Sequence, residues 1–150
     1  HILANSDTLD DQLLKLRVRD AVLAALPEAV REAETPQQAA DALTYALPAL
    51  QQAADTALHA AHSPQTAAVR MERWLFPARR YENFTLPAGE YTALRIELGT
   101  AQGRNWFCVL YPALCVAGTT AEYPTEGENA MVFGRFEVRI AAIEFIKNLK

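Results

Sequence analysis

The first sixty residues carry apolar side chains at helical spacing. One set recurs every four positions: Leu14, Val18, Val22 and Leu26. This spacing predicts an amphipathic helix. Thr8 followed three positions later by Asp11 is a helix-start signal. Pro27 is expected to kink or end the helix, because its ring clashes with the preceding turn, and residues 28–33 are a short continuation.

A second helix-start signal follows at residue 35. Thr35 can cap, Pro36 suits the first helical position and Gln38 can reach back to the cap. Apolar residues then recur at heptad-like spacing: Leu43, Leu47, Leu50, Ala54 and Leu58. Pro48 falls inside this run, so we expect either a kink or two shorter helices. Ser63 and Pro64 close the region.

The apolar spacing changes to period two after the helices, as in strands. Residues 1–4 also resemble a strand, and residues 67–76 and 91–98 alternate between two faces. Residues 99–103 are predicted to form a five-residue hairpin loop. Residues 106–111 are apolar on both faces, which is typical of a central, doubly covered strand.

The last third of the chain is predicted to be a loop at 117–130 and then a C-terminal helix from about Val132. The predicted order is therefore a strand, helices, strands and a helix. This order indicates an α+β fold: a small antiparallel sheet packed by N-terminal helices and a C-terminal helix. We expect residues 1–150 to form one domain, since no linker divides them.

Composition supports a globular domain with a sizeable core, because 51% of the 150 residues are hydrophobic and 21% are charged. The net charge of −4, with scattered basic residues, argues against binding nucleic acid. No stretch approaches the roughly 20 apolar residues that span a bilayer. The chain starts at His1, without a Met and already strand-like. We expect that an export segment, a tag or part of a first strand preceded it.

The two cysteines, Cys108 and Cys115, leave two alternatives open. They are too far apart for a redox CxxC pair, and without nearby histidines they cannot bind zinc. They form either a disulfide in an oxidising compartment or two buried thiols. A disulfide needs a chain reversal at about residues 111–113. An extended chain would separate their Cα atoms by about 23 Å, whereas a disulfide needs about 5.5 Å.

Classical catalytic motifs are missing from the sequence. His59 and His62, three residues apart, could share a metal, but we favour a helix-end position near the negative end of the dipole. Cys108 has no local base, so we do not expect it to act as a nucleophile. We therefore expect no catalytic residue, no metal and no cofactor.

Two polar groups are candidates for binding a partner. His1 precedes Asn5, Ser6 and Asp7 by one short strand, and a strand-to-helix junction offers free N–H groups to a carboxylate. The alternative is that Asn5, Ser6 and Asp7 only cap the helix.

The second group is Arg104, Asn105 and Trp106, at the predicted hairpin. Tryptophan and arginine are frequent interface anchors. The alternative is that Trp106 folds onto the core.

Three separated parts of the chain resemble one known family. They are residues 1–7 (HILANSD) with 11–12 and 15–20 (KLRVRD), residues 86–91 (LPAGEY) with 93–96 (ALRI), and residues 103–115 (GRNWFCVLYPALC). In this order they resemble the stage II sporulation protein R family. The last of these is the most distinctive.

The resemblance implies a signalling protein that is made in the forespore and secreted into the space between the forespore and mother-cell membranes. There it activates a membrane-embedded aspartic protease of the mother cell, which cleaves a sigma-factor precursor. Any approach to the membrane is through this partner, and neither a small-molecule substrate nor nucleic acid is implied.

We therefore expect the seven candidate residues to form part of the contact with the protease: His1, Asn5, Ser6, Asp7, Arg104, Asn105 and Trp106. One alternative is an exported hydrolase that uses His1, Asp7 or Cys108. Another is a passive scaffold domain of the cell envelope.

Overall fold

The computed structural model describes residues 1–80, 85–108 and 110. The elements in chain order are β1 (Ile2–Leu3), α1 (Leu9–Ala24), α2 (Glu28–Arg31), α3 (Pro36–Ala60), β2 (Ala67–Phe76), β3 (Arg79–Arg80), β4 (Thr85–Leu86), β5 (Gly89–Leu98) and β6 (Asn105–Trp106). The α+β class is confirmed. The predicted loop at 117–130, the predicted C-terminal helix and Cys115 lie outside the described residues.

The first helix begins as predicted. The side chain of Thr8 accepts a hydrogen bond from the backbone N–H of Asp11, and α1 ends at Ala24. Pro27 then caps the single turn of α2, which is the predicted short continuation. Three of the four residues of the predicted stripe are buried in the core, namely Leu14, Val18 and Val22, and Leu26 is half-buried.

The helix predicted to begin at residue 35 is α3, and it is continuous through Pro48. Thr35 and Gln38 form the predicted capping box at its start. The alternative of two shorter helices was therefore wrong. Pro48 is exposed, whereas Leu43 and Leu50 on either side of it are buried. Packing on both sides of the proline holds the helix together despite the lost hydrogen bond.

No helix of the described residues is long and apolar enough to cross a membrane.

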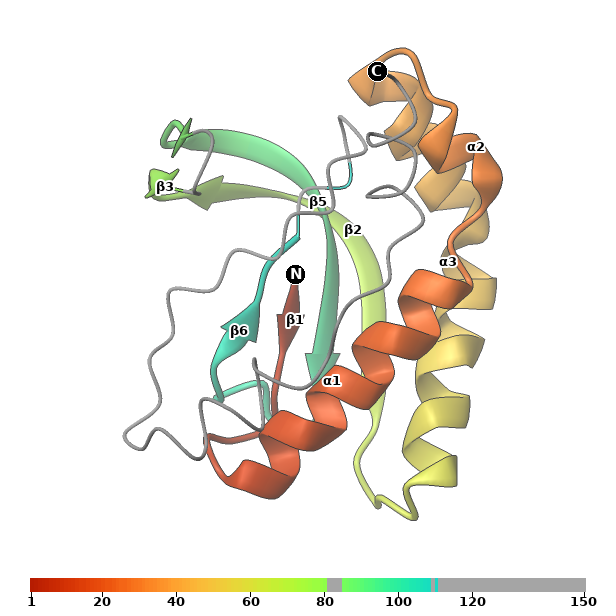
Figure 1. Cartoon of the computed structure of the whole chain (residues 1–150), viewed down its shortest axis with the longest axis vertical. Helices are drawn as coiled ribbons and strands as arrows, with labels where there is room; N and C mark the ends of the chain where they lie inside the picture. Colours follow the sequence, from red (N-terminus) through yellow and green to blue (C-terminus); the bar gives the residue numbers. More distant parts are fainter. Residues whose placement is uncertain (81–84, 109, 111–150) are drawn as a thin grey trace, which may run out of the picture.

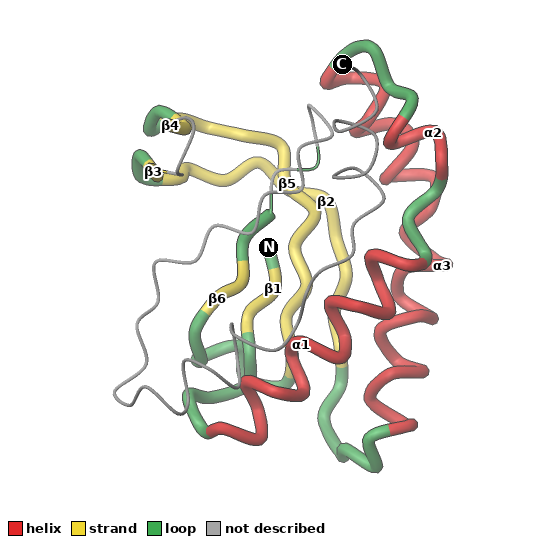
Figure 2. The backbone as a smooth tube through the Cα atoms, in the orientation of Figure 1, coloured by secondary structure: helices red, strands yellow, loops and turns green. Residues whose placement is uncertain are grey.

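The four-stranded sheet has the order β2-β5-β1-β6, with α1 and α3 packed on one face (Figures 1 and 2). The strands β2 and β5 pair antiparallel over ten residues each, but β1 runs parallel to β5. The sheet is therefore mixed, and the prediction of an antiparallel sheet was wrong on this point. The parallel partner of β5 is thus the start of the chain, which joins a sheet built mainly from later residues.

The connection between β5 and β6 is not the predicted hairpin loop at 99–103. The two strands do not pair with each other, because β1 lies between them. Ile2 is the register partner of Ile96 on one side and of Trp106 on the other. Spacing along residues 91–111 contains no sign of a strand inserted from the other end of the sequence.

Within the described residues, the strand predicted at 106–111 is shorter than expected and lies at the edge of the sheet, while residues 109 and 111 of the predicted range fall outside them. β6 covers Asn105–Trp106 and is the last strand in the described sheet. Its apolar character on both sides has a different cause. Trp106 is buried with the helices, and Phe107 stacks edge-on against the rings of His1 and Phe76, with centroids 4.7 and 5.6 Å apart. An aromatic cluster therefore accounts for the second apolar side.

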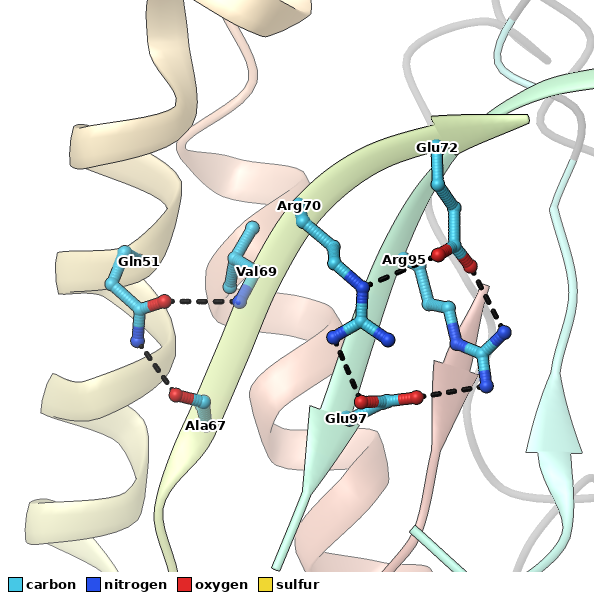
Figure 3. A network of polar contacts seen from close by, with 7 residues as sticks. All are labelled: Gln51, Ala67, Val69, Arg70, Glu72, Arg95 and Glu97. Atoms are coloured by element: carbon cyan, nitrogen blue, oxygen red, sulfur yellow. Dashed lines mark hydrogen bonds and ion pairs between the residues drawn. The ribbon is translucent and has the colours of Figure 1, made fainter. Parts of the chain in front are cut away.

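The sheet face away from the helices carries charged side chains that pair with one another (Figure 3). Arg70 on β2 bonds Glu97 at 2.8 Å and Glu72 at 3.2 Å, and Arg95 on β5 bonds both glutamates. The Arg95 guanidinium lies 4.4 Å from the ring centre of Trp74. Arg70, Glu72, Arg95 and Glu97 are thus paired with one another within the domain.

Replacing Pro48 with alanine is expected to stabilise the domain. Alanine restores the N–H that can bond the carbonyl of Thr44, so the free energy of unfolding should rise by about 1–3 kcal/mol. Urea unfolding measures this change. The matched control is Pro36→Ala at the first position of α3, where no helical hydrogen bond is lost and little change is expected. Equal effects of the two substitutions would contradict this account.

Candidate partner-binding site

Polar side chains gather where β1 ends and α1 begins. Residues 5–12 meet residues 99–104 here, and we call these two segments the junction. Their backbones are joined directly, since Gln102 N–H donates to Asn5 O at 3.2 Å and Gly103 N–H donates to Ala4 O at 2.8 Å. The junction therefore fixes the start of α1 to the connection between β5 and β6.

Asn5 clamps the connection through its side chain. Its Oδ1 accepts from the backbone N–H of Thr100 at 2.9 Å, and its backbone oxygen accepts from the Thr100 hydroxyl at 3.0 Å. Gly99 has φ of +55°, and a Cβ there would overlap Asn5 Oδ1. A glycine is thus required twice over, by conformation and by close approach.

The carboxylate of Asp11 is the centre of the junction. It accepts hydrogen bonds from Asn5 Nδ2 at 2.9 Å and from the Ser6 hydroxyl on one oxygen, and from Gln65 Nε2 on the other. Gln65 belongs to the segment between α3 and β2. One carboxylate therefore ties together the end of β1, the first turn of α1 and the start of β2.

These bonds set the charge of Asp11. Burial opposes ionisation, but the hydrogen bonds from Ser6, Asn5, Gln65 and Thr8 together lower the pKa of Asp11 below its usual value. The carboxylate is thus ionised when the junction is formed. Donors aimed at both of its oxygens favour that charged state.

Asp7 and Arg104 form the exposed part of the junction. Asp7 Oδ1 accepts from the backbone N–H of Arg104 at 2.7 Å, and its other oxygen lies 3.9 Å from the Arg104 guanidinium. Their side chains are 58% and 34% exposed, respectively. Two opposite charges are therefore presented to solvent on a fixed backbone.

Beneath the junction, one face of α1 buries charged residues. Lys15 is 3% exposed, and its ammonium donates to Gln12 Oε1 at 2.6 Å and to Arg104 O at 3.1 Å. Burial lowers the pKa of Lys15 to about 8, although the charge of Asp7 opposes this shift. One turn further on, Arg19 is 5% exposed and lies over the Trp106 ring at 5.5 Å.

The seven predicted contact residues do not form one group. The junction brings together Asn5, Ser6, Asp7 and Arg104, whereas Trp106 is 8% exposed and belongs to the core. The alternative that Trp106 folds onto the core is therefore the one observed. Asn105 is half-buried on β6, paired with Leu3.

His1 lies apart from the junction residues, at the far end of β1, where it lines the same cavity as Trp106. Its ring packs edge-on against Phe107 at 4.7 Å and Phe76 at 5.3 Å. The expected grouping of His1 with Asn5, Ser6 and Asp7 is therefore not observed, because β1 separates them.

The hydrolase alternative finds no support in the described residues. Asp7 bonds Arg104 at the junction, whereas His1 and Cys108 line a cavity at the other end of β1. The cavity holds about 20 Å³, enough for a water molecule but not for a substrate. No metal-binding cluster occurs within this part of the chain. The pairing of Cys108 with Cys115 stays a prediction.

Sequence reasoning missed four residues on which the junction depends: Asp11, Lys15, Gln65 and Thr100. Asp11 was interpreted only as a capping partner, and Lys15 was noted only within the KLRVRD motif of residues 15–20. The signal for Lys15 was its spacing of three and four residues from Gln12 and Arg19, which places three polar residues on one stripe of α1. Gln65 and Thr100 gave no signal, since their partners are distant in sequence.

Comparison with known proteins gives one family. A family model described as Stage II sporulation protein R matches residues 1–121. A stage II sporulation protein R of Bacillus subtilis (strain 168) is 38% identical over 114 residues, which are 76% of this chain and 51% of that relative. The chain thus spans about half the length of this relative. No solved structure matches.

Replacing Asp11 with asparagine is expected to destabilise the domain by about 1.5–3 kcal/mol, because hydrogen bonds to a charged acceptor are lost. Urea unfolding measures the change. Asp10→Asn is the matched control, since Asp10 is an exposed acid in the same first turn of α1.

The same pair of variants gives a pH test. The pKa of Asp11 is lower in the folded than in the unfolded chain, so its contribution is present above about pH 4 and is lost as pH falls below that value. The stability of Asp11→Asn should therefore fall less with acid than that of Asp10→Asn. Parallel pH profiles would contradict the role of Asp11.

Lys15 predicts the opposite trend at alkaline pH. Its pKa falls from 10.5 to about 8 on folding, so the unfolded chain binds more protons between these values. The stability contribution of Lys15 should therefore rise as pH rises through this window. Lys15→Met should remove this part of the rise, measured by urea unfolding at about pH 7 and about pH 10. Arg17→Met, at an exposed position of α1, should leave it intact.

Proposed function

The chain belongs to the stage II sporulation protein R family, and from this membership we propose that it is an exported sporulation signal. In this proposal it is secreted into the space between the forespore and mother-cell membranes. There it activates a membrane-embedded aspartic protease of the mother cell, which processes a sigma-factor precursor. It acts as a ligand of the protease and not as a catalyst.

The structural observation that supports the proposal is the solvent-accessible Asp7–Arg104 pair on a junction held by backbone and side-chain hydrogen bonds. The backbone of Arg104 is held on both sides, by Asp7 through its N–H and by Lys15 through its carbonyl. A protein that binds another protein through fixed charged groups loses less conformational entropy on binding. This is the arrangement expected of a recognition surface.

An activator must bind the active form of its target better than the inactive form. Moving a protease from about 1% to about 99% active needs about 5.5 kcal/mol of differential affinity. A few central contacts can supply this, because hot-spot residues contribute at least about 2 kcal/mol each.

The contact set proposed from the sequence is accordingly divided by role. Asp7 and Arg104 are the proposed contacts, with the exposed Thr100 and Gln102 beside them. Asn5 and Ser6 act as positioning residues, because their side chains bond Thr100 and Asp11.

The proposal is tested by co-expression of the chain with the protease and the sigma-factor precursor in a non-sporulating host. Cleavage of the precursor is expected only when the chain is exported. Cleavage that requires the chain inside the cell, or no cleavage at all, would refute the signalling role. A variant of the protease without catalytic activity shows whether the protease is the protein that cleaves the precursor.

The sharpest variant in this assay is Arg104→Ala. It removes the guanidinium but keeps the N–H that Asp7 accepts from and the carbonyl that Lys15 donates to. Processing is expected to fall at least about tenfold, whereas Arg17→Ala, on the exposed side of α1, should process normally. Both variants should show the circular dichroism of the parent. Normal processing by folded Arg104→Ala would exclude this residue from the contact.

A further inference from the structure

Among the described residues, the outer edge of β2 is uncovered over part of its length. In the described sheet β2 has β5 on one side and no strand on the other. Such an edge presents unpaired N–H and C=O groups, and proteins usually cover or blunt it. The question is which backbone groups remain available.

Gln51 of α3 identifies the outward-facing residues (Figure 3). Its side-chain amide donates to Ala67 O and accepts from the Val69 N–H, both at 3.0 Å. The amide thus bonds two alternate edge residues as a neighbouring strand would. The hydrogen-bonding direction of a strand backbone repeats every two residues. The backbone N–H and C=O groups of Met71, Arg73 and Leu75 therefore also point away from β5.

The β2–β5 register supports this assignment. The even-numbered residues of β2 pair with the odd-numbered residues of β5, from Ala68–Glu97 to Trp74–Tyr91. On the other side of β5, Ile96 N–H donates to the backbone oxygen of His1, directly before β1. The pairing of β2 with β5 therefore keeps one register along the whole of β2. On the outer edge of β2, α3 covers only the N-terminal part.

The open part of the edge is also where apolar side chains reach solvent. Trp74 is 46% exposed and Leu75 is 72% exposed, on opposite faces of the strand. Arg73 beside them is exposed and pairs only with the exposed Glu90, at 2.6 Å. A strand added along residues 71–75 would cover both apolar side chains.

Charge favours an acidic occupant. Residues 67–80 contain four arginines and one glutamate, a net charge of +3, although the whole chain carries −4. Arg70 is paired with Glu97 and Glu72, and Arg73 is paired with Glu90. In the sequence the surplus therefore lies at Arg79 and Arg80, just beyond the end of β2. Two copies of this edge would bring like charges together, so self-pairing is disfavoured.

We propose that residues 71–75 of β2 bind an extended acidic segment of a partner protein as an additional strand. Main-chain hydrogen bonds supply the affinity and the alternating side chains supply the selectivity. Trp74 and Leu75 pack against the apolar side chains of that segment, and the arginines attract its acids. The surface differs from the junction, and the proposal does not depend on the signalling function.

The test uses the purified 150-residue chain and a blocked peptide of about eight residues in which valine alternates with glutamate. We expect binding with Kd below about 1 mM. The lysine counterpart should bind at least about tenfold more weakly. Amide exchange followed by NMR reports the site: the N–H groups of Met71, Arg73 and Leu75 should exchange fast in the free chain and slowly in the complex.

Two variants at one position separate backbone from charge. Arg73→Pro removes an outward N–H, which an edge strand tolerates without loss of its inward ladder, and should abolish binding. Arg73→Ala keeps the N–H and should weaken binding only severalfold. The spectrum of each variant shows whether the sheet is intact, and Leu75→Ser is used if Arg73→Pro does not fold.

Four results would overturn the proposal. They are absence of binding at about 1 mM peptide, equal affinity for the two peptides, slow exchange of the three amides already in the free chain, and a concentration-dependent dimer that protects them. Since processing in the co-expression host is a separate measurement, failure here leaves the signalling proposal standing.

Discussion

The fold depends on the insertion of β1 between β5 and β6. Ile2 is paired with Ile96, 94 positions later in the chain, and with Trp106. Without β1 the end of β5 and the whole of β6 have no common partner, because these two strands do not pair with each other. Contacts of such long sequence separation form late and at a high entropic cost. Two residues of strand thus join the two halves of the sheet, and their loss would separate the halves while leaving the β2–β5 ribbon intact.

The polar network at the junction follows from that insertion. A strand that ends inside a sheet leaves backbone groups of its own and of the crossing connection without a neighbouring strand, so these groups take their partners from side chains. Asn5 supplies them for Thr100, Asp7 for Arg104, and Lys15 for the Arg104 carbonyl. The buried charge of Lys15 is costly, and its lowered pKa is the measure of that cost. In the proposed function, partner contact and architecture use the same residues, since the side chains that bond the crossing connection also hold the backbone of Arg104.

Local signals predicted the elements well and their arrangement poorly. The caps at Thr8 and Thr35, the helical stripes and the alternation at 91–98 are properties of neighbouring residues, and each was confirmed. The strand order was missed because it depends on pairing between the start of the chain and residues far along the sequence. The local spacing of apolar residues carries no information on such pairing. Of the candidate contact residues, Asn5, Ser6, Asp7 and Arg104 lie together at the junction, whereas Trp106 lies in the core, as one of the two alternatives had it. An aromatic residue at a chain reversal has the same sequence pattern whether it faces solvent or, as here, the core.

The two surfaces differ in what they can recognise. The junction offers two side-chain charges on a fixed backbone, so the freedom lost on binding is mainly that of the Asp7 and Arg104 side chains, about 0.5–1.5 kcal/mol each. The edge of β2 offers main-chain groups, and a strand that adds to it must give up the freedom of every residue it orders, about 1–2 kcal/mol per residue. Rigid charges therefore suit discrimination between two shapes of a folded target, as activation requires. An open edge suits capture of a segment that has no fixed shape before it binds, where hydrogen bonds and apolar burial along the strand must offset the ordering.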